Sequence, residues 1–274
     1  MKKFIGFVVL FIIVMQVSFG QHGLENIIVE KYYVSDKSDS KAKSGGYLPK
    51  GSVTYRIYVD LKKGYRLQAV YGIQGHELRI ATTTWFFNNE EFGASTANDI
   101  HYSSLGKNTV MLDSWLSVGA GAQGYYGVLK SEDDTLKTII NSEQRKLLQN
   151  DDSSAGIPIK IRDGLKPASP IAVVSTFGID KEIELFNNRN RKDIPNVFST
   201  TNGSWASFGG AIGPDDNNKV LIAQLTTNGV LSFELNLQLG TPDGKIENYV
   251  ARNPENNQVL MDCLKYSSEK NQVQ

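Results

Sequence analysis

Apolar and polar residues alternate along most of the chain, and this two-residue period predicts β-strands. In residues 24–34, Ile27, Val29 and Tyr33 alternate with polar neighbours, as they would on a strand with one buried face. The 25 glycines, 12 tyrosines and 12 phenylalanines agree with strands joined by turns. The same period marks residues 52–61, 65–73, 76–87, 109–120, 157–161 and 226–239.

One segment, residues 131–150, departs from this period. Its apolar residues recur at helical spacing, and Ser131 with Asp134 resembles a capping box, which together predict a helix of about three turns. The small, polar residues 151–154 then predict a loop. We therefore predict four parts: a signal peptide at 1–20, an N-terminal β-domain at 24–130, a helical and loop linker at 131–154, and a C-terminal β-domain at 155–267.

The two predicted β-domains share short phrases. Residues 71–89 and 177–188 both contain an aromatic-Gly-Ile and end in Phe-Asn-Asn, and residues 104–112 resemble 211–222. These similarities favour a duplicated β-domain, with one larger sandwich as the alternative. In either case the predicted fold class is all-β, an antiparallel β-sandwich of jelly-roll or immunoglobulin-like type, with one short linking helix.

Residues 226–239, TTNGVLSFELNLQL, predict a hairpin around the Asn-Gly pair. A three-residue loop at 227–229 places Leu225 opposite Leu231, so that apolar side chains meet across the two strands. In this register a row of alternate polar residues points to solvent, namely Ser232, Glu234, Asn236 and Gln238.

The N-terminus has the features of a secretory signal peptide. Lys2 and Lys3 precede a charge-free apolar run of about 14 residues, and small residues follow before Gln21. Because roughly 20 residues are needed to span a bilayer, we expect no transmembrane anchor in the mature chain. We expect an exported protein, located in the periplasm, at the cell surface or outside the cell. Cys263 is the only cysteine, so an internal disulfide is impossible.

The net charge and the lack of known catalytic motifs narrow the classes of function that the sequence supports. Removing the two leader lysines leaves 27 basic and 29 acidic residues, which gives no electrostatic reason to expect nucleic acid or an anionic membrane as a partner. The sequence contains no nucleophile elbow, P-loop or dinucleotide fingerprint. We therefore expect a non-catalytic protein rather than an enzyme.

Three groups of polar residues are candidates for chemistry. Glu234 has the spacing of a strand-borne catalytic carboxylate, but the amides Asn236 and Gln238 occupy its partner positions and cannot act as acids. His76 and His101 are too far apart in sequence for a compact metal signature. We expect no cofactor, with calcium as the alternative because clustered oxygens occur in three acidic loops, at residues 131–134, 151–154 and 214–218.

Aromatic residues are the candidates for ligand binding, because an exposed ring offers a flat apolar face to a sugar. Trp115 lies on the opposite strand face from Leu116, and Trp205 lies in the Gly-rich stretch NGSWASFGG. Tyr125 and Tyr126 follow in the stretch GAGAQGYYGVL. We predict these four aromatic residues as ligand-binding residues, with packing in the core as the alternative. The expected partner is a polysaccharide or another surface protein.

Several phrases resemble a family of modules in exported bacterial proteins. They include LENIIVEKYYVSD, GSVTYRIYVDLKKGYRLQAVYG, NGSWASFGGAIGP and VLIAQLTTNGVLSFELNLQLG. Proteins that carry such modules are often large and end in a C-terminal sorting domain for secretion across the outer membrane. The family has no established activity and no assigned catalytic residues, so the resemblance implies export but assigns no site.

Together these patterns predict a secreted, non-catalytic β-sandwich protein with a structural, adhesive or ligand-binding role. The alternative is a carbohydrate-binding or carbohydrate-active protein with a dispersed acid pair.

Overall fold

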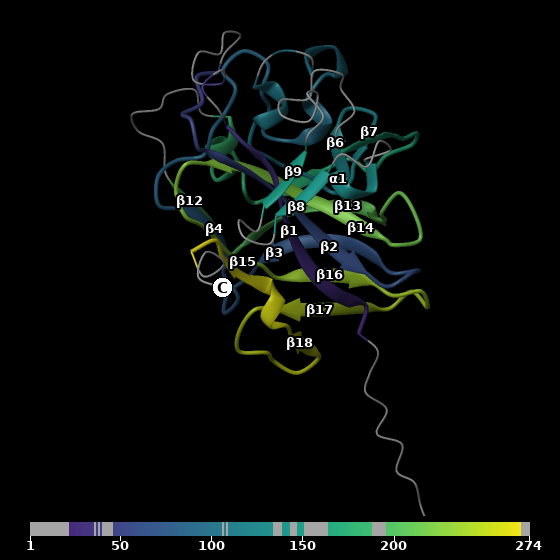
Figure 1. The fold of residues 1–274 in the computed structure, drawn as a ribbon. Helices are drawn as coiled ribbons and strands as arrows, with labels where there is room; N and C mark the ends of the chain where they lie inside the picture. The colour runs from purple at the N-terminus through teal and green to yellow at the C-terminus, as the bar shows by residue number, and fades with distance from the viewer. Residues whose placement is uncertain are drawn as a thin grey trace, which may run out of the picture.

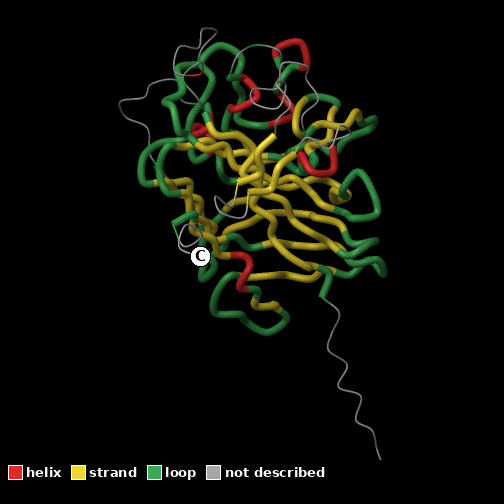
Figure 2. The backbone as a smooth tube through the Cα atoms, viewed as in Figure 1, coloured by secondary structure: helices red, strands yellow, loops and turns green. Residues whose placement is uncertain are grey.

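The computed structural model describes residues 22–35, 37, 39, 46–105, 107, 109–133, 139–142, 147–150, 164–187 and 196–269. Within them the chain is almost entirely β-structure, in antiparallel sheets apart from one parallel pair of strands (Figures 1 and 2). The predicted all-β fold of sandwich type is confirmed. The described helical segments are α1 (Lys130–Asp133) and 3-10 turns at Ala97–Asp99, Tyr102–Ser104, Val110–Leu112, Ile183–Phe186 and Asp262–Leu264.

Three larger sheets and two small ones make up the described fold. Sheet A consists, in spatial order, of β1 (Leu24–Val34), β2 (Val53–Leu61), β14 (Lys219–Thr227) and β5 (Trp115–Leu116). Sheet B consists in the same way of β11 (Ser175–Phe177), β13 (Gly203–Ala211), β3 (Arg66–Gly72), β16 (Leu237–Gly240), β17 (Ile246–Val250) and β18 (Gln258–Leu260). Sheet C consists of β12 (Val197–Thr200), β4 (Leu78–Thr82), β15 (Leu231–Glu234) and β19 (Lys265–Ser267). The small sheets are β10 (Leu165–Pro167), β7 (Tyr125–Gly127) and β6 (Ala120–Ala122), and the pair β8 (Ile139–Ser142) and β9 (Leu147–Asn150).

Sheets B and C form one bent layer of the sandwich. Only a few residues separate β3 from β4, β12 from β13, and β15 from β16 along the chain. One strand of each pair lies in sheet B and the other in sheet C, and the three pairs have the same spatial order in both sheets. Sheet A lies across this layer (Figure 1), and the main hydrophobic core fills the space between them. Fully buried core residues come from all three sheets, for example Ile57 from sheet A, Leu237 from sheet B and Phe198 from sheet C.

Sheet A is buried on both faces. Its second face carries Tyr58 and Trp115, which pack in another apolar cluster with residues of the segment 97–122. Polar side chains on this face are therefore buried as well, among them Arg56 and Gln224. The expectation that the polar members of alternating strands face water is wrong for sheet A, because this covering segment excludes solvent from its second face.

Arg56 is the centre of a buried hydrogen-bond network on the covered face. Its Nε donates to Oε1 of Gln224 at 2.8 Å, and its Nη1 donates to the carbonyl oxygen of Gly164 at 2.8 Å. Nearby, the buried Glu30 accepts a hydrogen bond from the backbone N–H of Lys130 at 2.7 Å. Burial raises the pKa of Glu30, although the charge of Arg56 acts in the opposite direction. The network joins β1, β2 and β14 to segments that lie far away in sequence.

Strands from the two predicted β-domains are mixed in the same sheets. β2 pairs with β14, β3 with β13, and β4 with β12, and each pair joins the N-terminal half to the C-terminal half. The division into separate domains at 24–130 and 155–267 is therefore wrong. The repeated phrases also differ in structure, since residues 71–89 contain the strand β4 whereas the described part of 177–188 contains a 3-10 turn.

The segment 131–150 does not form the predicted helix of three turns. Helix α1 ends at Asp133 after a single turn, and β8 and β9 pair as an antiparallel hairpin. An isolated helix of this length is marginal unless an apolar face packs on a core, and the β-branched Ile139 and Ile140 favour a strand. The predicted strand at 157–161 and the predicted signal peptide at 1–20 lie outside the described residues. None of the described helices has the length and apolar character needed to cross a membrane.

The predicted hairpin of residues 226–239 is also wrong. β14 pairs with β2 and β5 in sheet A, whereas β15 pairs with β4 and β19 in sheet C. The Asn-Gly turn therefore carries the chain from one layer of the sandwich to the other. The predicted orientation of the side chains on β15 agrees with the structure, because Leu231 and Phe233 are buried and Glu234 is half-buried. Asn236, expected in solvent, is buried at the bend between sheets B and C.

Candidate functional site

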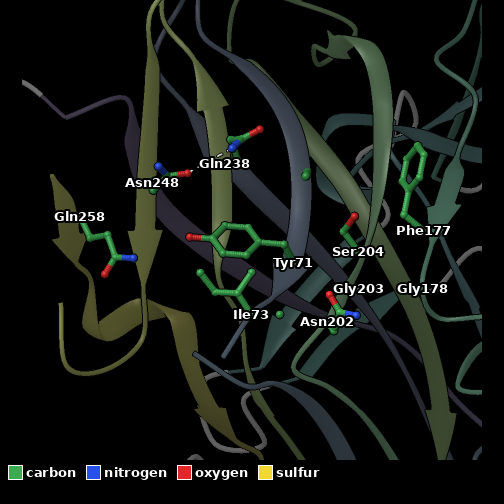
Figure 3. A pocket seen from close by; sticks show the side chains of 12 residues that line it. Tyr71, Ile73, Phe177, Gly178, Asn202, Gly203, Ser204, Gln238, Asn248 and Gln258 are labelled. Atoms are coloured by element: carbon green, nitrogen blue, oxygen red, sulfur yellow. Dashed lines mark hydrogen bonds between the residues drawn. The ribbon is translucent and has the colours of Figure 1, made fainter. Parts of the chain in front are cut away.

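A groove with a volume of about 660 Å³ crosses the outer face of sheet B (Figure 3). It is lined by Ala69, Tyr71, Gly72, Ile73, Phe177, Gly178, Asn202, Gly203, Ser204, Gln238, Asn248 and Gln258. These residues come from strands of the sheet and from the turns that follow them. The groove is within the size range of small-molecule sites in proteins.

The strand register places three amide side chains in one row across the groove. Gln238 on β16 lies opposite Asn248 on β17, and Asn248 lies opposite Gln258 on β18. Ala69 on β3 lies on the other side of Gln238, so that no large side chain fills the floor there. Gln238 Nε2 donates to Asn248 Oδ1 at 3.3 Å (Figure 3). Gln238 Oε1 and Asn248 Nδ2 have no hydrogen-bond partner among the described residues.

A second row, two residues further along the strands, contributes two aromatic rings and a hydroxyl. Phe177 on β11 lies opposite Ser204 on β13, and Ser204 lies opposite Tyr71 on β3. Tyr71 and Phe177 stand on opposite sides of Ser204 (Figure 3), and the side chain of Phe177 is exposed. Burial raises the pKa of Tyr71, which keeps its hydroxyl protonated at neutral pH. Both rings and both hydroxyl-bearing residues line the groove.

A bulge in β13 adds a further exposed ring beside the groove. Ala206 pairs with Ala69 and Ala211 pairs with Leu67, so extra residues on β13 loop out between these two points. Phe208, in this bulge, is 84% exposed and packs edge-on against Phe177, with ring centroids 6.0 Å apart. Gly210 has φ +73°, and a Cβ there would lie 2.8 Å from the Cβ of Arg66. Glycine therefore permits the bulge that exposes Phe208.

The lining of the groove has no charged residue among the residues that the structure describes. Amide groups both donate and accept hydrogen bonds, as hydroxyl groups do, while the rings offer apolar faces. Such a surface matches a neutral ligand that carries many hydroxyl groups and some C–H surface. The described lining contains no Asp, Glu, His or Cys side chain.

The two tryptophans predicted to bind a ligand are buried instead. Trp115 is 2% exposed in the second apolar cluster, and Trp205 is 0% exposed in the main core. Both rings are therefore inaccessible to a ligand, and their prediction as binding residues is wrong. Strand period alone cannot identify accessible rings in this fold because segments distant in sequence cover the sheets.

Tyr125 and Tyr126 are half-buried on β7, in a small sheet away from the groove lining. The ring of Tyr125 stacks on the exposed Tyr102, with centroids 4.6 Å apart and an angle of 4° between the planes. A ligand-binding role for Tyr125 and Tyr126 stays a prediction.

Glu234 forms an ion pair with Arg252 through both of its carboxylate oxygens. Its neighbours along the strand face are the amides Asn236 and Gln238, as their spacing indicates. Asn236 Nδ2 donates to the carbonyl oxygens of Tyr71 and His76, both at 3.1 Å, and so fixes the bend between sheets B and C. This arrangement gives Glu234 a charge partner rather than a second catalytic acid.

The histidines and the acidic loops do not come together as a metal site in the described part of the chain. His76 is buried beside the bend, whereas Nδ1 of His101 lies 3.1 Å from Oε1 of Gln123. No group of three or more His, Cys, Asp or Glu residues suited to a metal ion occurs in the described part of the chain. Asp215 and Asp216 pair with Lys166 and Lys63, and the acidic loop at 151–154 lies outside the described residues.

Sequence reasoning missed most of the groove. The alternating polar face of residues 232–238 pointed to Gln238, but nothing in the sequence linked it to Asn248 or Gln258. The strand period marks Tyr71 only as one member of an alternating strand. Comparison with protein-family models, with curated proteins and with solved structures finds no match to this chain.

Proposed function

We propose that this protein is a non-catalytic β-sandwich module that binds a glycan in the groove on the outer face of sheet B. The observation that carries the proposal is the lining of this groove, which combines a row of amides with two rings and has no charge among its described residues. The leader-like N-terminus supports an exported protein, for which polysaccharides outside the cytoplasm are accessible partners.

The chemistry of the groove suits a sugar chain. Neighbouring hydroxyl groups on a sugar can bind one amide by donating to its oxygen and accepting from its nitrogen. Gln238, Asn248 and Gln258 provide three such amides in adjacent strands, and strands lie about 4.8 Å apart. The row therefore offers a polar group about every 5 Å, a spacing comparable to the size of one sugar ring. Tyr71 and Phe177 offer apolar surface to the C–H faces of the sugar.

A non-catalytic role is supported by the absence of acids among the described groove residues. Hydrolysis of a glycosidic bond uses two carboxyl groups on either side of that bond. The carboxylate of Glu234 lies outside the groove lining and is paired with Arg252. We therefore expect binding without turnover.

Glycan-array binding tests the proposal. The wild-type protein is expected to bind at least one neutral polysaccharide, and Tyr71→Ala is expected to weaken that binding by about tenfold, since a stacked ring and a hydroxyl donor are lost. Tyr47→Ala is the matched control, because Tyr47 is an exposed tyrosine outside the groove lining. Its affinity for the glycan is expected to equal that of the wild type.

Three outcomes would contradict the proposal. The first is the absence of any glycan binding by the wild-type protein, and the second is equal loss in Tyr71→Ala and Tyr47→Ala. The third is release of new reducing ends from a bound polysaccharide, which would make the protein an enzyme. Thermal melting of each variant separates loss of binding from loss of folding.

A further inference from the structure

Two further hollows lie on the described outer face of the bent layer, and alternate residues between Ser232 and Gln238 line the groove and these hollows. Gln238 lines the groove, and Asn236 with Glu234 lines a hollow of about 240 Å³. Glu234 and Ser232 then line a hollow of about 260 Å³ over sheet C. These alternate residues follow β15 and β16 across the bend between sheets B and C, where Asn236 is buried. A chain ligand that occupies both the groove and the hollow over sheet C would therefore cross the surface above Asn236.

The hollow over sheet C is rich in positive charge. Its lining consists of Arg79, Ser232, Phe233, Glu234, Arg252, Lys265, Tyr266 and Ser267, and we call it the cationic hollow. Glu234 lies opposite Arg79 on one neighbouring strand and opposite Lys265 on the other. Three cationic side chains thus surround one carboxylate.

The ion pairs within this hollow leave positive charge uncompensated. Arg252 takes both oxygens of Glu234. Lys265 pairs with Asp262 at 3.0 Å, but the side chain of Asp262 is 90% exposed, and such a pair in water contributes little. The half-buried Arg79 forms no ion pair or hydrogen bond through its guanidinium with another described residue. Arg79 is therefore a cation that makes no direct ion pair with the described residues, and the carboxylate opposite it, that of Glu234, is already paired with Arg252.

We propose that the cationic hollow binds an anionic substituent, a carboxylate or a sulfate ester, of the glycan that occupies the groove. This inference rests on the proposed function. The planar guanidinium of Arg79 can bind two oxygens of such a group at once. Ser232 and Ser267 lie opposite each other across β15 and β19 and add hydroxyl donors. The ligand is then an acidic polysaccharide whose neutral surface lies on the amides and rings of the groove.

Titration with sodium sulfate tests the cationic hollow independently of the groove. NMR signals of arginine Nε–Hε groups are followed in sulfate and in sodium chloride at equal ionic strength. The Arg79 signal is expected to shift saturably in sulfate only, and Arg79→Gln is expected to weaken sulfate binding by about tenfold. Arg66→Gln, which alters an exposed arginine on β3, is the matched control. Equal shifts in both salts, or equal effects of the two substitutions, would overturn the inference.

Binding to dextran sulfate and to unmodified dextran separates this inference from the proposed function. Wild-type protein is expected to bind the sulfated polymer more tightly, and Arg79→Gln is expected to remove that preference. Tyr71→Ala is expected to weaken binding to the sulfated polymer as well. Loss only in Arg79→Gln would support the hollow and contradict the groove. Loss only in Tyr71→Ala would support the groove and contradict the hollow.

Discussion

Replacing Trp205 by alanine is expected to lower the free energy of unfolding by about 3–5 kcal/mol, because the change opens a cavity in the main core. Trp205 is fully buried, and its ring packs edge-on against Phe198 with centroids 5.9 Å apart. Its Nε1 also donates to the carbonyl oxygen of Ser117 at 3.0 Å, which joins sheet B to the end of β5 in sheet A. The substitution therefore removes both apolar packing and a buried hydrogen bond. Urea denaturation followed by circular dichroism measures the loss.

Phe208→Ala is the matched control for this experiment. Phe208 lies a few positions further along the same strand but is exposed, so its replacement is expected to change the free energy of unfolding by no more than about 0.5 kcal/mol. A loss below about 1 kcal/mol in Trp205→Ala would contradict the placement of Trp205 in the core. It would also restore Trp205 as a candidate for an exposed binding surface.

Arg56→Met is expected to lower the free energy of unfolding by about 3–5 kcal/mol as well, because it removes one charge from a buried polar network. Methionine retains much of the apolar stem but lacks the donors to Gln224 and to the carbonyl oxygen of Gly164. It also removes the guanidinium that lies 3.7 Å from the centre of the Tyr32 ring. The buried Glu30 then loses the charge of Arg56 and keeps that of Lys130 as its nearby cation.

Two further variants identify the source of that loss. Arg66→Met replaces an exposed arginine on β3 and is expected to leave the free energy of unfolding within about 0.5 kcal/mol of the wild type. The double variant Arg56→Met/Glu30→Gln is expected to lose less stability than the sum of the single variants, since neutralising Glu30 removes the charge that Arg56 no longer balances. Strictly additive losses would show that Arg56 and Glu30 are not coupled.

Local patterns predicted the positions of several strands, whereas the predicted strand at 109–120 contains a 3-10 turn at Val110–Leu112, the short strand β5 and the first residue of β6. The alternation in residues 24–34 and 52–61 matches β1 and β2, and Ile57 and Val59 lie in the main core as their spacing required. These features depend on the period of side chains along one strand, which a sequence displays directly.

Pairing between strands could not be predicted, because it depends on contacts between distant residues. The Asn-Gly sequence correctly indicated a turn, but a turn does not determine whether the next strand stays in the same sheet. Likewise, Arg56 alternates with apolar residues as a solvent-facing side chain would. Its burial depends on residues far from it in the sequence, such as Gly164, whose carbonyl oxygen accepts a hydrogen bond from the Arg56 guanidinium.

The candidate site shows the same limit. Gln238, Asn248 and Gln258 form a row only because β16, β17 and β18 pair in a particular register, and Tyr71 on β3 belongs to the second row. A single asparagine or glutamine on a strand has no sequence signature of ligand binding. Two of the four aromatic residues that the sequence indicated as ligand-binding, Trp115 and Trp205, are buried in the core.

The most direct test of the groove is a two-dimensional ¹⁵N NMR titration of side-chain amide groups with the neutral oligosaccharide that binds most tightly in the glycan array. The NH₂ signals of Gln238, Asn248 and Gln258 are predicted to shift together and to saturate with one binding constant. Signals of Gln123 and Asn228, which are exposed amides outside the groove lining, are predicted to stay in place. Saturable shifts at Gln123 or Asn228, with none at Gln238, Asn248 and Gln258, would contradict binding in the groove.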